Sequence, residues 1–444
     1  MARTLFKNAR IVNEGGDAPG DLLVVDGRIA RIGTSLSDAT AEVVDLEGRI
    51  LMPGVIDDQV HFREPGLTHK ADLATESLAA AAGGTTSFMD MPNVRPASLT
   101  QALLEERYAL AARKSAVNYS FYMGASNDNL EEVLATDPRR VCGVKAFMGS
   151  STGNMLVDDP GTLEALFERC PTLIATHCED EETVRRASAE LRARKGDAAT
   201  AADHPAARPR EGCLKSSTLA TDLARRLGTR LHVLHITTAE EVMLFESGPV
   251  ADKRITSEAC VHHLSFTDAD YATLGNLLKC NPAVKTARDR DAIWEALLAD
   301  RIDVVATDHA PHTAEEKAGS YWTAPGGVPQ VQHSLLQMHE HVLAGRLDWP
   351  KLVEKMCHAV ADCFRIERRG YLREGYAADL VIFDERAGTR VDDEPTYSKC
   401  GWSPYAGHVF PGRVVATYVN GRAVYADGGA KYVPGAAERL AFMA

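Results

Sequence analysis

The sequence predicts an α/β protein, namely a parallel (β/α)8 barrel with a small β module formed by the two ends of the chain. The length of 444 residues exceeds one ordinary domain and suffices for a large barrel with a second module. Between residues 50 and 309, short apolar runs alternate with helical patterns, as expected when helices join the strands of a parallel sheet. Near both ends, this alternation gives way to β-hairpin signals.

Two tight turns predict the terminal module. Asp26-Gly27 and Asn420-Gly421 each lie between short apolar stretches, which is a strong signal for a two-residue hairpin turn. The apolar run DLVIFD at residues 379–384 adds a strand near the C-terminal end. We therefore expect residues 1–52 and 370–444 to form one β domain and residues 53–369 to form a catalytic barrel.

Eight apolar runs supply the predicted barrel strands. They begin at residues 50, 85, 117, 141, 172, 230, 254 and 302. Helical patterns separate most of them, for example at residues 99–114 and 217–228. The segment 195–212 (KGDAATAADHPAARPREG) is polar and rich in proline, so it predicts a long loop with no helix or strand.

Composition narrows the possible partners and the compartment. The chain has 49 Lys and Arg against 62 Asp and Glu, a net charge of −13, which argues against nucleic acid or an anionic membrane as a partner and leaves a small-molecule substrate. Its nine cysteines form no CxxC pair, which suits reduced thiols and a cytoplasmic location. We also expect no signal peptide and no membrane span, because no apolar run approaches the roughly 18 residues that a span needs.

Candidate metal ligands fall at the ends of the predicted strands. Because a barrel brings the carboxyl ends of all its strands to one face, these side chains should converge there although they lie far apart in sequence. One histidine at a strand end is more often structural, but several such placements together favour a shared site. The residues are Gln59 and His61 after the first run, Lys145 in the fourth, and His177, His235 and Asp308 at the ends of the fifth, sixth and eighth.

Gln59 and Lys145 are unusual residues for a metal site. Gln59 and His61 are two residues apart on a strand and so point to the same face, but an amide oxygen is a poorer zinc ligand than imidazole. Gln59 is therefore either a metal ligand or a hydrogen-bonding neighbour. Lys145 lies between apolar residues in GVKAF, and burying its ammonium group unpaired would cost several kcal/mol. A reaction with CO2 would convert it into a carbamate anion that can bridge two metal ions.

Several motifs resemble those of dihydroorotases, which are members of the cyclic amidohydrolase superfamily. The resemblance covers nearly the whole chain and departs from the family pattern at Gln59, where the first motif normally has histidine. The motifs are DDQVHFREPG (57–66), DMPN (90–93), GVKAFMGSSTG (143–153), ATHCED (175–180), HVLHITT (232–238), KCNPAVKT (279–286), ATDHAPHTAEEK (306–317) and GYAADLVIFD (375–384).

The resemblance implies a TIM-type barrel with a β-sandwich built from both termini, and one or two zinc ions per chain. The matching ligands are His61, Lys145 as the carbamate formed with CO2, His177, His235 and Asp308, with Gln59 as a possible addition. Zinc lowers the pKa of bound water, which supplies the hydroxide that attacks a ring amide. Asp308 would be the catalytic acid and base that carries the proton to the leaving nitrogen.

The resemblance also implies a set of substrate contacts. Arg63 lies two residues after His61, and its guanidinium suits a two-point grip on a carboxylate. His262 and His263 are expected to be structural, because adjacent strand residues point to opposite faces. The full substrate-binding set is Arg63, Asn93, Asn281, His312 and the backbone of Gly326 and Gly327.

The leading functional prediction is dihydroorotase, the reversible cyclisation of N-carbamoyl-L-aspartate to L-dihydroorotate in the de novo synthesis of UMP and other pyrimidines. One alternative is an allantoinase or dihydropyrimidinase, but their substrates lack the carboxylate that Arg63 and His312 would bind. A second alternative is a catalytically inactive subunit that supports a transcarbamoylase, and Gln59 alone favours it. We expect a homodimer or larger homo-oligomer, possibly in association with aspartate transcarbamoylase.

Overall fold

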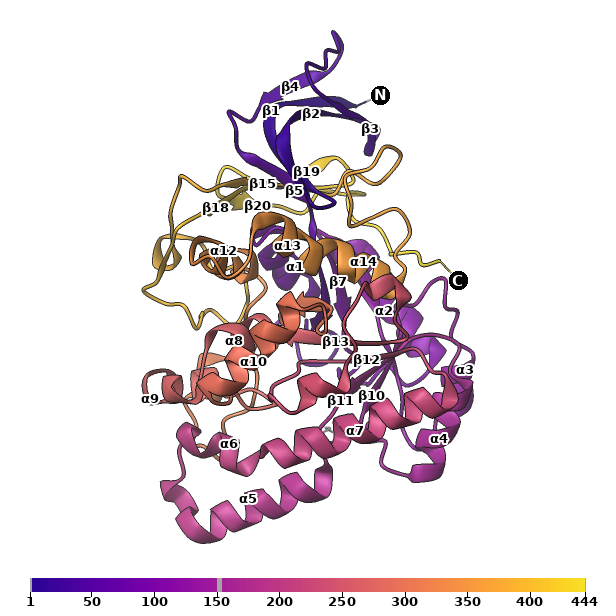
Figure 1. Cartoon of the computed structure of the whole chain (residues 1–444), viewed down its shortest axis with the longest axis vertical. Coiled ribbons are helices and arrows are strands. Elements are labelled where there is room, and N and C mark those ends of the chain that lie inside the picture. The colour runs from indigo at the N-terminus through magenta and orange to yellow at the C-terminus, as the bar shows by residue number, and fades with distance from the viewer. Residues whose placement is uncertain (1, 150–153, 444) are drawn as a thin grey trace.

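The computed structural model describes residues 2–149 and 154–443. Its centre is a barrel of eight parallel strands, as the sequence predicts, and the first and last strands meet through a bridge between Val60 and His309. In Figure 1 the helices lie around these strands, and the terminal sheet stands at one end of the molecule. The barrel strands are β6 (Val55–Val60), β7 (Thr85–Asp90), β8 (Asn118–Phe121) continued by β9 (Met123–Gly124), β10 (Val144–Phe147), β11 (Ile174–His177), β12 (Leu231–Val233), β13 (Ile255–Cys260) and β14 (Val304–Ala306).

Two of the predicted strands are divided. The run that begins at residue 50 forms β5 (Ile50–Pro53) in the terminal sheet and then β6 in the barrel, with Gly54 between them. A β-carbon at Gly54 would lie 2.0 Å from Oγ1 of Thr86, so only glycine fits where the chain enters the barrel. The third run is broken at Tyr122, because β8 pairs with β7 whereas β9 pairs with β10.

The terminal module is one nine-stranded sheet in which β5 joins the two ends of the chain, pairing with β1 on one side and β15 on the other. Phe6 and Leu22 from one half share a hydrophobic core with Ile382 and Ala416 from the other, so the sheet encloses its own core. The predicted hairpin turns are present, since Asp26-Gly27 and Asn420-Gly421 all have positive φ angles. The strands are β1 (Arg3–Asn13), β2 (Gly16–Val25), β3 (Arg28–Gly33), β4 (Glu42–Asp45), β5, β15 (Leu380–Asp384), β18 (Arg413–Val419), β19 (Arg422–Ala426) and β20 (Gly429–Ala430), with β16 (Thr389–Arg390) and β17 (Val409–Phe410) paired separately.

Helices follow most of the barrel strands and begin at polar caps. Asp72, Thr100, Asp159, Asp180 and Thr286 each accept a hydrogen bond from a backbone N–H in the first turn of the helix that follows. None of the helices in the described part of the chain is long and apolar enough to span a bilayer. The helices are α1 (Leu73–Ala82), α2 (Gln101–Lys114), α3 (Leu130–Leu134), α4 (Pro160–Arg169), α5 (Glu181–Lys195), α6 (His204–Ala207), α7 (Arg210–Leu227), α8 (Val261–Ser265), α9 (Tyr271–Leu274), α10 (Ala287–Leu298), α11 (Ala314–Lys317), α12 (Ser334–Leu343), α13 (Trp349–Val353) and α14 (Ala359–Phe364).

The prediction of a loop without helix at residues 195–212 is wrong. The segment holds two 3-10 turns (Gly196–Ala198 and Ala201–Asp203), helix α6 and the start of α7. Thr200 and Asp203 cap each other across the second turn. Pro205 lies in the first turn of α6, where its missing N–H costs no hydrogen bond. Proline and polar residues therefore mark helix starts here.

Candidate active site

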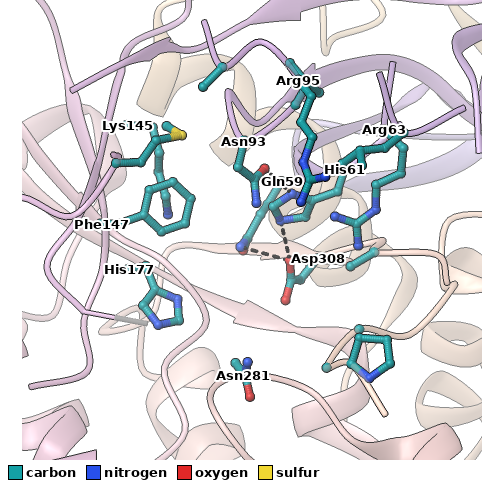
Figure 2. A pocket seen from close by; sticks show the side chains of 18 of the residues that line it. Gln59, His61, Arg63, Asn93, Arg95, Lys145, Phe147, His177, Asn281 and Asp308 are labelled. Carbon is teal, nitrogen blue, oxygen red and sulfur yellow. Dashed lines mark hydrogen bonds and ion pairs between the residues drawn. The ribbon is translucent and has the colours of Figure 1, made fainter. Parts of the chain in front are cut away.

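A cavity of about 620 Å³ opens at the carboxyl ends of the barrel strands. Figure 2 shows Lys145, Phe147 and His177 on one side of it and Arg63 on the other, with Asp308 between them. The last four residues of the GVKAFMGSSTG motif, 150–153, lie outside the described residues. All twelve residues that the sequence proposes for the site line this cavity: Gln59, His61, Arg63, Asn93, Lys145, His177, His235, Asn281, Asp308, His312, Gly326 and Gly327.

His177 and His235 face each other from the ends of neighbouring strands. Nδ1 of His177 lies 2.9 Å from Nε2 of His235. Burial lowers the pKa of both imidazoles, that of His235 well below its usual value, so both rings are neutral near pH 7. The backbone at His235 has φ +40, an uncommon angle for a residue other than glycine.

The carboxylate of Glu179 holds the far side of His177. Nε2 of His177 lies 3.0 Å from a carboxylate oxygen of Glu179, which also accepts a hydrogen bond from Arg208. Burial acts to raise the pKa of Glu179, but Arg208 and His177 outweigh it and lower the pKa to about 2. An ionised carboxylate fixes the ring hydrogen of His177 on Nε2. The lone pair on Nδ1 is therefore directed at His235.

Lys145 is buried beside these histidines, with 1% of its surface exposed. Its Nζ lies 4.6 Å from the centre of the Phe147 ring. Burial lowers the pKa of Lys145 to about 7, although Asp308 and Glu258 act in the opposite direction. A substantial fraction of this amine is neutral near pH 7, and CO2 reacts with the neutral form.

His61, Gln59 and Asp308 form a second group. Oδ1 of Asp308 lies 3.1 Å from Nε2 of His61 and 3.2 Å from Nε2 of Gln59, while the Gln59 oxygen lies 3.8 Å from Sγ of Cys260. Nδ1 of His61 donates its hydrogen to the Asn93 side-chain oxygen at 2.8 Å. The other ring nitrogen of His61, Nε2, therefore faces Asp308. Burial acts to raise the pKa of Asp308, but the contact with His61 outweighs it and the pKa is lowered.

These donors suit zinc. Two ligand atoms of one tetrahedral zinc ion lie about 3.3 Å apart when their bonds are about 2.0–2.1 Å long. The 2.9 Å separation of the His177 and His235 nitrogens and the 3.1 Å separation of the His61 and Asp308 atoms are both close to this value. The partner groups at Glu179 and Asn93 are those that commonly orient metal-binding histidines. Neutral imidazoles, a carboxylate and a carbamate-forming lysine are a fitting donor set.

The opposite wall of the cavity is cationic. His312 lies between Arg63 and Lys70: its Nε2 is 3.1 Å from an Arg63 nitrogen and its Nδ1 is 3.0 Å from Nζ of Lys70. Burial, together with the charge of Arg63, lowers the pKa of His312, so the imidazole stays neutral. Nε2 of His312 also lies 3.1 Å from the carbonyl oxygen of Gly326.

The 325–327 loop is held over this wall by buried contacts. Nζ of Lys317 donates to the carbonyl oxygens of Lys279, Pro325 and Gly327 at 2.9–3.1 Å. Gly327 has φ +145, and a β-carbon there would lie 2.3 Å from the Ala310 carbonyl oxygen, so glycine is required. The backbone of the loop thus reaches the cavity beside the side chain of Asn281.

Sequence reasoning missed three residues of the site. Glu179 stands inside the quoted motif ATHCED, whereas Lys70 lies four residues after FREPG, and only the fold shows their contacts with His177 and His312. Arg95, which is exposed, lines the cavity mouth without a recognisable sequence signal. The placement of His262 and His263 on a strand is wrong, because both lie on α8, although they do not line this cavity.

Comparisons with known proteins agree with this geometry. The model of a protein family described as "Amidohydrolase family" matches residues 50–424 of this chain. The chain is 32% identical over 433 residues to an allantoinase of Bacillus velezensis, covering 96% of this chain and 95% of the relative. It is equally 32% identical, over 429 residues, to a dihydroorotase of Bacillus cytotoxicus, covering 95% and 98%.

A solved structure matches along nearly the whole chain. The L-hydantoinase (dihydropyrimidinase) of Arthrobacter aurescens has a TM-score of 0.92 at 29% identity, covering 99% of this chain and all of that one. The dihydropyrimidinase of Brevibacillus agri has a TM-score of 0.89 at 23% identity, which shows the shared fold.

Proposed function

We propose that this chain, which belongs to the amidohydrolase family, is a dihydroorotase that interconverts L-dihydroorotate and N-carbamoyl-L-aspartate. Relatives named dihydroorotase, allantoinase and hydantoinase support the broader statement that the chain is a cyclic amidohydrolase. The relatives named dihydroorotase and allantoinase stand at the same 32% identity, so sequence similarity does not choose between their substrates. The shape and charge of the cavity support the choice.

The observation that carries the proposal is the position of one neutral imidazole between two cations. Lys70 and Arg63 are donors only, and a neutral imidazole accepts a hydrogen bond at just one nitrogen. Nδ1 of His312 lies 3.0 Å from Lys70 and 3.3 Å from the Glu316 carboxylate, and its Nε2 lies 3.1 Å from both Arg63 and the Gly326 carbonyl oxygen, so the single lone pair of His312 serves only one of the two cations. An anion in the cavity supplies the missing acceptor, and dihydroorotate has a ring carboxylate.

The two walls of the cavity have different roles in the proposed reaction. Arg63 and the backbone of the 325–327 loop hold the carboxylate side of the ring, while the ring amide lies toward Lys145, His177 and Asp308. Zinc bound by the histidines, Asp308 and the Lys145 carbamate would polarise the amide carbonyl and activate water at neutral pH. Asp308, ionised in the resting site, accepts a proton during the attack on the carbonyl and returns it to the leaving ring nitrogen.

The Lys145 carbamate belongs to this proposal. The buried amine with its lowered pKa and the lone pair of His177 Nδ1 beside it support the assignment. A carbamate adds one negative charge to that of Asp308. Together these two charges offset half of the charge of two divalent ions.

The test is a comparison of substrates with purified enzyme loaded with zinc. We expect kcat/KM for L-dihydroorotate to exceed that for allantoin, hydantoin and dihydrouracil by at least tenfold, because these three lack the carboxylate. Faster turnover of allantoin would assign the chain to the allantoinases. No turnover of any of the four substrates by the zinc-loaded enzyme would favour the inactive-subunit alternative.

A further inference from the structure

A second group of potential metal ligands lies inside the barrel, outside the set that lines the active-site cavity. Asp58 comes from β6, His232 from β12 and Glu258 from β13, and all three side chains have 0% of their surface exposed. Nε2 of His232 lies 3.3 Å from Oδ2 of Asp58 and 3.8 Å from Oε2 of Glu258. One ligand atom from each residue lies within 4.8 Å of the other two.

The atoms that face one another in this group are without hydrogen-bond donors. Both carboxylate oxygens of Asp58, Nε2 of His232 and Oε2 of Glu258 have no hydrogen-bond partner among the described residues. Buried polar atoms almost always have one. Four such atoms within one buried group of three side chains indicate that a bound group satisfies them together.

The hydrogen bonds around His232 determine which nitrogen faces the carboxylates as an acceptor. Thr256 donates its hydroxyl hydrogen to the Leu231 carbonyl oxygen, so its oxygen accepts from Nδ1 of His232 at 2.8 Å. The ring hydrogen is therefore on Nδ1. The Nε2 lone pair then points at Asp58 and Glu258, which is the arrangement of a metal-binding histidine oriented by a second residue.

We propose that Asp58, His232 and Glu258 bind a structural zinc ion in the barrel interior beneath the catalytic cavity. A divalent ion neutralises two buried carboxylates that would otherwise be costly to desolvate. The separations of 3.3 and 3.8 Å lie at and slightly above the roughly 3.3 Å expected for two ligands of one zinc ion. One imidazole and two carboxylates are donors that zinc accepts.

A proton on His232 fits these distances less well. An imidazolium Nε2–H could donate to Asp58 at 3.3 Å, but the Glu258 oxygen at 3.8 Å is beyond hydrogen-bond distance. Without an ion, burial and the neighbouring Asp58 raise the pKa of Glu258 to about 8, so bound protons would have to replace the charge of the metal ion. A metal ion bound between the three side chains would contact both carboxylates.

The proposed ion also supports the catalytic site. The second oxygen of Glu258, Oε1, accepts the backbone N–H of His235 at 3.0 Å. Zinc bound at Oε2 would fix this carboxylate in place, and with it the strained backbone of His235. The ion would therefore help to position His235 in the active site, without contacting the substrate.

The first test uses wild-type protein produced in zinc-supplemented medium and crystallised without chelators. Anomalous difference maps collected above and below the zinc absorption edge should show a peak between His232, Asp58 and Glu258, separate from any peak in the cavity. Anomalous peaks confined to the cavity, or density for water at the buried position, would overturn the proposal.

The second test counts zinc by mass spectrometry of the purified protein. Asp58→Asn should hold one zinc equivalent fewer per chain than the wild type. Asp57→Asn is the matched control and should keep the wild-type count, because the Asp57 carboxylate accepts from Thr307 and from the backbone of Gln59 instead. An Asp58→Asn protein with unchanged zinc content would refute the site, and if that variant does not fold, the anomalous maps of the wild type decide.

Discussion

Replacing Arg63 with methionine tests the proposed substrate most directly. Arg63 is buried, with 7% of its surface exposed, and its Nε donates to the Pro311 carbonyl oxygen at 3.1 Å. Burial lowers the pKa of Arg63, but the carboxylates of Asp308 and Asp90 oppose this and the guanidinium stays charged. Methionine keeps much of the side-chain volume and removes the charge and every donor.

The expected loss follows from the hydrogen bonds that the substrate would lose. One charge-assisted hydrogen bond contributes about 1.5–3 kcal/mol, so kcat/KM for dihydroorotate should fall about 10- to 150-fold. Because the hydrogen bonds of Arg63 go to Pro311 and His312, and to none of the predicted metal ligands in the described part of the chain, zinc content should not change. A steady-state assay of dihydroorotate hydrolysis together with metal analysis measures both effects.

Arg95→Met is the matched control, because Arg95 is a second arginine of the cavity wall but is exposed at its mouth. We expect it to change kcat/KM only a few-fold, since an exposed charge is screened by solvent. Equal losses of kcat/KM in the two variants would mean that the overall positive charge of the cavity attracts the substrate, and not a direct hydrogen bond from Arg63. Unchanged kinetics in Arg63→Met would refute the reasoning altogether.

Three further substitutions test the metal-binding wall. Lys145→Ala should lose zinc and activity, with partial rescue by short carboxylic acids that can replace the carbamate, and an alanine variant with full zinc content would contradict the bridging role. Gln59→His should tighten the zinc held by His61 and Asp308, seen as slower loss to a chelator, whereas an unchanged rate would leave position 59 outside the metal shell. Glu179→Gln should weaken zinc binding about 10- to 100-fold in a competition titration, because a neutral amide cannot supply the charge that orients His177, and wild-type affinity would contradict that role.

The barrel could be predicted because its strands are apolar on both faces and short. Runs such as residues 85–91 and 302–309 have no competing helical period, and the helical patterns between them are amphipathic. The division of the first run at Gly54 could not be predicted, because β5 and β6 read as one continuous apolar stretch. What separates them is the close approach of Thr86, which is a tertiary contact.

The convergence of the candidate site residues on one cavity could be predicted from their positions at strand ends, whereas their hydrogen-bond partners could not. A barrel brings His177 and His235 together whatever their neighbours are, so the topology alone places them. The contact between Glu179 and His177 depends on how the chain turns after β11. The contact between Lys70 and His312 joins residues 242 positions apart and leaves no trace in local sequence.

The alternation of a regular strand gives no indication that Asp58 faces the same side of β6 as Gln59. Alternation would send Asp58 and Gln59 to opposite faces of β6, with only Gln59 toward the interior. The pairing of β6 with β7 shifts register between Asp57 and Val60, and both consecutive side chains then face inward. Gln59 lies at the cavity between Asp308 and Cys260, and Asp58 reaches His232 below it. A single irregularity of one strand thus supplies residues to both proposed metal sites, so substitutions at positions 58 and 59 should affect different ions.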